Sequence, residues 1–165
     1  MNQTHYKSLL LITLVVSATV LGILALYSHT IMPGLRKVDD PTFVKSFQAI
    51  DRQIINPIFM LQFFAPLFLL AAVSYYAYKH HLVEAKYIYV AFACYLAAVV
   101  ITVAVNVPLN DGIKKVGSVA SGDAATTARA QFQEAKWLFF NHARTLLTLI
   151  SVCCTSAAVW VSKAL

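Results

Sequence analysis

Charged residues are scarce in this sequence, and their scarcity excludes an ordinary soluble domain. Only 12% of the 165 residues are Asp, Glu, Lys or Arg, against about 25% in soluble domains. Hydrophobic residues make up 59% and gather in long runs, which is typical of an integral membrane protein. The formal net charge is +6, but the basic residues lie in tails and loops between the apolar runs. We therefore expect membrane lipids, and not nucleic acid, as the partner of these charges.

The residue patterns of several chemistries are also missing. The three cysteines lie inside apolar runs and form no C-x-x-C pair, so no disulfide framework is expected. There is no His-x-x-x-His or Glu-x-x-His pair, no Gly-rich phosphate loop and no nucleophile elbow. His80 and His81 are adjacent, but neighbours point apart on a helix and do not suggest a metal site. We predict neither a metal nor a bound cofactor.

Long apolar runs are present, and they predict four membrane spans at about 9–31, 58–78, 87–105 and 146–161. The first run would extend about 34 Å as a helix, enough to cross a hydrocarbon core of about 30 Å. Met32-Pro33-Gly34-Leu35 is expected to end the first helix, and Pro108 to end or reorganise the third. The fold class we predict is an all-α membrane protein, a four-transmembrane-helix bundle forming one domain over residues 1–165.

Two connections between these spans are long enough to cap one mouth of the bundle. In the first, Asp40-Pro41 is typical of a helix start. A short amphipathic helix should follow, with an apolar face of Phe43, Phe47, Ile50 and Ile54 and a polar face of Gln48, Asp51 and Arg52. In the second connection, the segment 114–127 is rich in small residues and is expected to be the most mobile part of the chain. Helical character returns over 128–137.

A polar cluster is expected where the last span begins. Trp137, Asn141 and Arg144 lie at helical spacing and share one face. An arginine there must find a partner or reach water, because an ionised group facing lipid is costly. Further polar groups are due at the same membrane level: Arg52, Asn56, Asn106 and Asn110. Below them, Arg144, Thr148, Ser151 and Thr155 form a seam that is more typical of helix packing than of a binding site.

Several motifs together resemble the anthrone oxygenase-like family of small four-span membrane proteins. The most specific pair is Asn106-Val107-Pro108-Leu109-Asn110 followed by Trp137-x-x-x-Asn141-x-x-Arg144. The others are Met32-Pro33-Gly34-Leu35, Phe47-Gln48-Ala49-Ile50-Asp51 and Asn56-Pro57-x-Phe59. The resemblance implies a four-span fold. It also implies similarity to enzymes that oxidise anthrones to anthraquinones with O2, without an obvious metal or flavin.

On that hypothesis the polar cluster would bind and ionise a lipophilic aromatic small molecule. Arg144 would stabilise the anion, with Asn106, Asn110 and Asn141 as further donors and with Arg52 and Asn56 nearby. Trp137, Phe139 and Phe140 could stack on the ligand. The base would be His142, His29 or Asp51, and the sequence does not choose among them.

Two other functions remain open. Arg144 could pair with Asp51 or Asp111 and merely pin the loops, with Asn106 and Asn110 as caps and Trp137 as an interfacial anchor. The chain would then be a non-catalytic protein that binds a lipid or a protein partner. A transporter would need a homo-oligomer, because one chain has no duplicated half and no charges inside its spans. The sequence leaves the oligomeric state open.

The distribution of basic residues bears on orientation. Four spans place both termini and the short turn at 79–86 on one side, with Lys7, Lys79, Lys86 and Lys163, while the long loops hold the other nine basic residues. The raw count favours cytoplasmic long loops, but the positive-inside rule is most reliable for short loops. Family members resembling this chain often have a basic short turn, for which Lys79-His80-His81 is a weaker version. We expect cytoplasmic termini and the plasma membrane.

Overall fold

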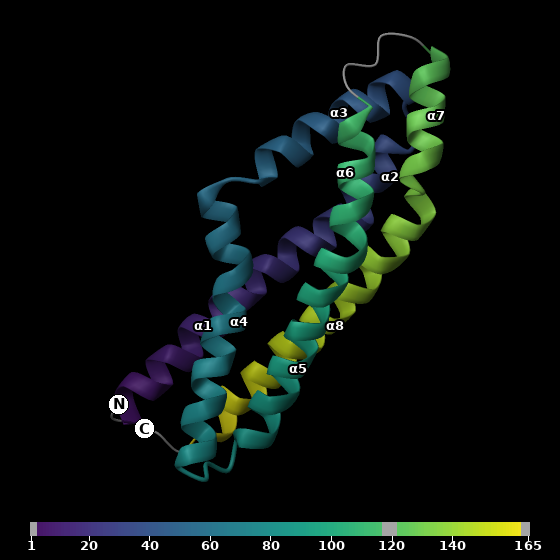
Figure 1. Cartoon of the computed structure of the whole chain (residues 1–165). Coiled ribbons are helices and arrows are strands. Elements are labelled where there is room, and N and C mark those ends of the chain that lie inside the picture. Colours follow the sequence, from purple (N-terminus) through teal and green to yellow (C-terminus); the bar gives the residue numbers. More distant parts are fainter. Residues whose placement is uncertain (1–2, 117–121, 163–165) are drawn as a thin grey trace.

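The computed structural model describes residues 3–116 and 122–162, and within them the chain is helical without a strand (Figure 1). The elements are α1 (Gln3–Leu26), η1 (Tyr27–Ile31), α2 (Met32–Leu35), α3 (Asp40–Ile54), α4 (Pro57–Lys79), α5 (Ala85–Ile101), η2 (Thr102–Asn106), α6 (Val107–Lys115), α7 (Gly122–Phe132) and α8 (Glu134–Val161). Four helical stretches are long and apolar enough to cross a membrane: His5–Leu35, Pro57–Lys79, Ala85–Lys115 and Gly122–Val161. The chain is therefore an all-α integral membrane protein, as predicted, and these stretches contain the four expected spans.

Helix α8 is central to the bundle and packs on α1 and α5. Its buried residues recur every three or four positions, from Trp137 and Asn141 through Arg144 to Thr148, Ser151 and Thr155. Thr13 and Ser17 are the buried small residues of α1. Small side chains let helix backbones approach closely within a membrane. The Thr148 and Thr155 hydroxyls donate to carbonyls one turn earlier on α8, at 2.8 Å each. The seam expected below Arg144 is thus buried in the bundle.

Two π-helical turns carry the first and third spans past their prolines. A proline has no N–H, and its ring collides with the carbonyl four residues earlier in an α-helix. The turn η1 comes just before Pro33, and η2 comes just before Pro108. The extra residue in each turn shifts the carbonyls, so that the helix continues. The prediction that Met32-Pro33-Gly34-Leu35 ends the first helix is confirmed, because these four residues form its last turn and the helix ends at Leu35. Pro108 reorganises the third helix and does not end it.

Helices α2, α3, α6 and α7 form a cap at one end of the bundle (Figure 1). The start of α1, the end of α8 and the turn between α4 and α5 lie at the opposite end. The cap has its own core: Met32, Phe43, Val44, Phe47, Ile113, Ala125, Ala128, Phe132 and, from α8, Trp137. The expected amphipathic helix is α3, but its N-cap is Asp39 and not Asp40. Gln48 and Asp51 of its polar face are buried, because α6 and α7 pack against α3.

The segment expected to be most mobile is largely helical. Lys114 and Lys115 belong to α6 and Gly122–Thr127 to α7, while 117–121 fall outside the described residues. Ala125 and Ala128 are fully buried, so the small residues serve close packing of α7. Arg129 of α7 lies 4.2 Å above the Phe43 ring and donates to the Val38 carbonyl at 3.0 Å. The residue between α7 and α8, Gln133, has a φ of 52°, and the chain changes direction there.

Candidate functional site

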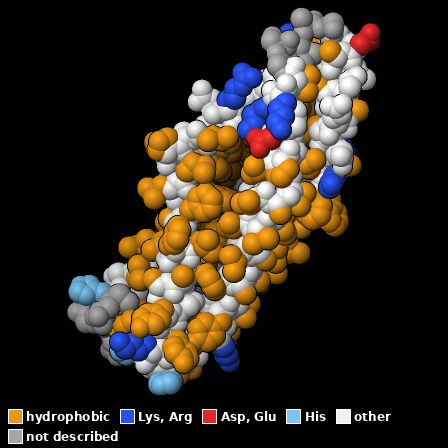
Figure 2. Space-filling view, in the orientation of Figure 1, with side chains coloured by type: hydrophobic (Ala, Val, Ile, Leu, Met, Phe, Trp, Pro, Cys, Tyr) orange, Lys and Arg blue, Asp and Glu red, His pale blue; other side chains and the backbone are white. Residues whose placement is uncertain are grey.

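A cavity of about 250 Å³ lies where the bundle meets the cap. Figure 2 shows its hollow among hydrophobic side chains, with acidic and basic side chains on one border. Its apolar wall consists of Ile23, Leu24, Phe47, Ile50, Ile54, Ile55, Phe59, Met60, Phe63, Phe64, Val103 and Val107. Ligand pockets occupy about 300–1,000 Å³ and are lined mainly by such residues with a few polar groups. The cavity is slightly smaller than that range.

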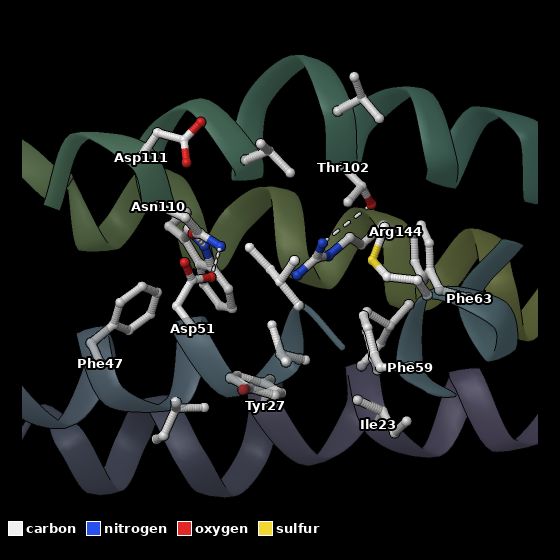
Figure 3. A pocket seen from close by; sticks show the side chains of 18 of the residues that line it. Ile23, Tyr27, Phe47, Asp51, Phe59, Phe63, Thr102, Asn110, Asp111 and Arg144 are labelled. Carbon is white, nitrogen blue, oxygen red and sulfur yellow. Dashed lines mark hydrogen bonds between the residues drawn. The ribbon is translucent and has the colours of Figure 1, made fainter. Parts of the chain in front are cut away.

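Seven polar or amphipathic side chains complete the wall: Tyr27, Asp51, Thr102, Asn110, Asp111, Lys114 and Arg144; Trp137 lies beside them. Four of the residues predicted for the site are therefore brought together: Arg144, Asp51, Asn110 and Trp137. Figure 3 shows Asp51 and Asn110 toward one end, and Arg144 and Thr102 toward the other. The two ends differ in how their charges are compensated.

Arg144 is only 8% exposed. Its Nε and Nη2 donate to Asn141 Oδ1 at 3.0 and 2.8 Å, and its Nη1 donates to Thr102 Oγ1 at 3.2 Å. The guanidinium lies 5.4 Å from the centre of the Trp137 ring. No carboxylate among residues 3–116 and 122–162 forms an ion pair with it. The alternative expectation, that Arg144 pairs with Asp51 or Asp111, is wrong.

The two π turns hold the partners of Arg144. Asn141 Nδ2 donates to Ser28 Oγ of η1 at 2.6 Å and to the Leu24 carbonyl at 3.1 Å. Those bonds orient the amide so that its oxygen accepts both guanidinium contacts. Thr102 opens η2, and its hydroxyl donates to the Ala98 carbonyl at 2.8 Å. That direction of donation leaves the hydroxyl oxygen to accept from Arg144. π turns are frequent at functional sites. Here both π turns help to position the Arg144 side chain, η2 through Thr102 and η1 through the contact of Ser28 with Asn141.

Lys114 has the opposite arrangement. Its Nζ lies 2.9 Å from Asp51 Oδ2 and 2.8 Å from Asp111 Oδ1. Asn110 Nδ2 donates to Asp51 Oδ1 at 2.6 Å, and Trp137 Nε1 donates to Asn110 Oδ1 at 2.7 Å. One cation therefore faces two carboxylates in a hydrogen-bonded chain that ends at Trp137. This end of the cavity is compensated within the protein, whereas the Arg144 end can still accept an anionic oxygen.

The remaining predicted residues do not line the cavity. His142, His29 and Arg52 are exposed, as is Phe139, and Phe140 also lies outside the lining. Asn56 is the N-cap of α4 and accepts from the Phe59 amide at 2.9 Å. Asn106 is buried and donates to the Trp137 carbonyl at 3.2 Å. Within the described part of the chain, no three His, Cys, Asp or Glu side chains are grouped as a metal site.

Sequence reasoning missed Tyr27, Thr102 and Lys114 as lining residues. Tyr27 and Thr102 each lie six residues before a proline inside an apolar run, and this spacing was the available signal. A proline that a helix passes by a π turn exposes polar groups just upstream. Lys114 gave no such signal, because its inward position depends on α6 continuing the third helix.

Comparison with known proteins gives one match. The anthrone oxygenase family model matches residues 58–154, more than half of the chain. The match includes Asn106, Asn110, Trp137, Asn141 and Arg144, while Tyr27 and Asp51 lie outside it. No curated protein and no solved structure matches. The chain belongs to the anthrone oxygenase family.

Proposed function

We propose that this membrane protein oxidises a lipophilic aromatic compound with O2, and that it does so from the anionic form of the compound. The observation that carries the proposal is a buried arginine on a cavity wall whose hydrogen-bond partners are all neutral. The family name indicates the type of substrate, an anthrone. The reaction balances as one O2 consumed, one CH2 group converted to C=O, and one water released.

Arg144 supplies the stabilisation of the anion. Its bonds to Asn141 and Thr102 use three of the five N–H donors of a guanidinium. Removing a proton from the CH2 group opposite the anthrone carbonyl places negative charge on the carbonyl oxygen, by conjugation through the rings. A fixed cation at an apolar wall stabilises that charge more strongly than water-exposed donors do. Thr102 and Asn141 act as positioning residues, since they hold the guanidinium.

Asp51 is the base that we assign. Among the three candidates from the sequence, its carboxylate alone borders the cavity. It takes the C–H proton, and the resulting carbanion bonds to O2 and gives a peroxide anion. The proton returns to that anion to form a hydroperoxide. Removal of the second C–H proton breaks the O–O bond, and the departing hydroxide takes up this proton as water. Lys114 forms an ion pair with Asp51, with its Nζ 2.9 Å from Asp51 Oδ2.

A second candidate is a non-catalytic protein that binds the same class of ligand, or a lipid, in this cavity. The apolar wall and its anion site support binding whether or not a reaction follows. Turnover distinguishes the two candidates. For either one we propose membrane lipids around the spans and a lipophilic aromatic molecule in the cavity.

We also propose that the protein resides in the plasma membrane with cytoplasmic termini. The short turn between α4 and α5 carries Lys79 and Lys86, and short basic loops favour the cytoplasmic side. Single cysteines at Lys79 and at Lys45 of the cap, in a chain without its own cysteines, test this. In intact cells an impermeant thiol reagent should modify only the cysteine at position 45. Modification of position 79 alone contradicts the orientation.

The reaction is tested with purified protein in lipid nanodiscs and anthrone as the probe. O2 uptake and anthraquinone absorbance are recorded, and the rate with empty nanodiscs is subtracted. Arg144→Gln should lower the rate by on the order of 100-fold, as loss of an oxyanion donor does in other enzymes. Arg36→Gln is the matched control, because Arg36 forms only a surface ion pair with Glu134. Anthrone binding without O2 uptake in the wild type would favour the second candidate.

A further inference from the structure

Part of the cavity wall is exposed on the outside of the bundle. Four apolar lining residues have large exposed fractions: Ile55 with 59%, Met60 with 38%, Val103 with 57% and Val107 with 41%. The deep wall is different, since Leu24 is 4% and Phe63 is 6% exposed. The exposed residues therefore mark an opening.

The opening lies between two helices that separate toward the cap. Ile55 and Met60 belong to the start of α4 and the residues before it, whereas Val103 and Val107 belong to η2 and α6. Figure 1 shows α4 and the α5–η2–α6 helix joined at the hairpin end and diverging toward α3. The π turn η2 serves both the polar site and the opening. Its Thr102 accepts a hydrogen bond from Arg144, and the next residue, Val103, borders the opening.

The surface around the opening is apolar and lies in the spans. Leu61 of α4 is 72% exposed and Val100 of α5 is 55% exposed, and neither lines the cavity. Figure 2 shows the hollow continuous with this hydrophobic surface. Between the cavity and the cap lie the side chains of Phe47, Phe132 and Trp137. The centres of their rings are 4.5 to 6.2 Å apart. These rings separate the cavity from the core of the cap, and its apolar opening lies on the outside of the spans, with Lys114 and Asp111 on its charged border.

We propose that the ligand enters sideways from the lipid layer, between α4 and η2, and that Met60 and Val103 set the width of this portal. The ligand class is a flat aromatic molecule already dissolved in the membrane, which passes an apolar edge before its oxygen reaches Arg144. A water-soluble anion would meet no polar group on that path. The inference deepens the proposed function by naming the route, and the route can be tested without any reaction.

The test measures access to a thiol placed inside the cavity. Cys94, Cys153 and Cys154 are replaced by Ala, and Ile23→Cys puts a reporter on the α1 wall. The chain in nanodiscs is treated with N-phenylmaleimide, which dissolves in the bilayer, or with a cationic, water-soluble methanethiosulfonate. The portal is narrowed from either wall with Val103→Trp or Met60→Trp. The matched controls are Val100→Trp and Leu61→Trp on the same helices.

We expect N-phenylmaleimide to modify the reporter and the cationic reagent to leave it unmodified. Either portal substitution should slow the modification about tenfold, the factor given by about 1.4 kcal/mol of added barrier, while the controls leave the rate unchanged. Because all four positions face lipid, tryptophan is tolerated there without repacking the core. Equal rates in portal and control variants, faster modification by the cationic reagent, or a reporter that neither reagent reaches would each overturn the proposal. Normal labelling in a protein without O2 uptake would reject the reaction and keep the portal.

Discussion

Arg144 and Lys114 line the same cavity, yet their charges are balanced in opposite ways. Lys114 lies within 3 Å of two carboxylates and is part of a closed chain of polar contacts. Arg144 is more deeply buried and is held by an amide and a hydroxyl. A buried charge normally has a charged partner. The difference teaches that Lys114 stabilises the resting protein, whereas Arg144 is arranged for an anion that arrives from outside.

The two ends of the cavity also differ in the helix geometry around their cations. Of two π turns, Thr102–Asn106 supplies Thr102, which accepts from the guanidinium, and Tyr27–Ile31 supplies Ser28, which accepts from Asn141. At the compensated end, Asp51 and Lys114 come from α3 and α6 and bond to each other directly. π turns are frequent at functional sites. The two cations therefore predict opposite responses to mutation, in function for one and in stability for the other.

The largest effect is expected from Asn141→Asp, which gives Arg144 the kind of partner that Lys114 has. The new carboxylate neutralises the guanidinium before a ligand binds. Affinity for an anionic ligand should fall by on the order of 10- to 100-fold, as charge juxtaposition in a desolvated site requires. Equilibrium binding of a hydroxyanthraquinone in nanodiscs measures this. Gln53→Glu, at an exposed position of α3, is the matched change of charge. Equal losses in the two variants would contradict the role given to Arg144.

Lys114→Met should remove the ion pairs at the other end of the cavity and lower the stability of the protein. It leaves Asp51, which is 5% exposed, facing Asp111 without a cation. We expect a loss of about 2 kcal/mol in the free energy of unfolding, less than the 3–5 kcal/mol of fully buried pairs because Lys114 is partly exposed. Adding Asp51→Asn should restore most of it. Thermal unfolding in detergent measures both variants against Lys115→Met, the exposed neighbour. Equal stability of the two methionine variants would show that the ion pairs contribute nothing.

Trp137→Phe sharpens the comparison at the residue that touches both ends. It removes the indole donor to Asn110 Oδ1 but keeps an aromatic ring beside Arg144. The loss of one partly buried hydrogen bond should lower stability by about 1 kcal/mol. Trp160→Phe is the control, because Trp160 is 90% exposed. If the substitution lowers the free energy of ligand binding by more than the free energy of unfolding, Trp137 acts with Arg144 in binding the ligand.

The smallest effect concerns the cap, away from both cations. The Thr126 hydroxyl and then Arg129 donate to Asp40, and these bonds lower the pKa of that carboxyl below its ordinary value of 3.8. Because the folded pKa is the lower one, the contribution is present above pH 3.8 and is lost as the pH falls through the folded value. The protection of α7 amides, measured relative to their intrinsic exchange rate at each pH, should therefore fall as the pH drops below 3.8. Asp40→Asn should show the reduced protection at neutral pH. Unchanged α7 exchange in that variant would exclude the contact as a stabilising one.

Much of this architecture follows from the sequence. The apolar runs indicate four spans, and the spacing of Trp137, Asn141 and Arg144 places all three on one buried face. Helical periodicity shows well which residues share one face of a helix, because that grouping depends on local geometry alone. The same pattern grouped Gln48, Asp51 and Arg52 on one polar face, but it could not show that α6 and α7 bury the first two while Arg52 stays exposed.

The pairing of the charged side chains and the helix geometry around the prolines could not be predicted from the sequence. Whether Pro33 ends a helix or is bypassed by a π turn depends on tertiary packing, and the bypass decides which way Tyr27 and Ser28 face. The partner of Arg144 could not be chosen either, because the sequence offered both Asp51 and Asp111, and Lys114 was assigned to a loop. The continuation of the third helix through Pro108 brings Lys114 to both carboxylates.

The central claim is that the Arg144 guanidinium keeps its charge for an anionic ligand, and a bound indicator tests it most directly. The ionisation of 1-hydroxyanthraquinone in nanodiscs is followed by its visible absorption across a pH series. In the wild type, the bound indicator should ionise about one to two pH units below its value in empty nanodiscs, as expected beside an unpaired cation. Arg144→Gln and Asn141→Asp should abolish the shift, and Lys115→Met should keep it. The same ionisation pH in the wild type and in Arg144→Gln would contradict the account.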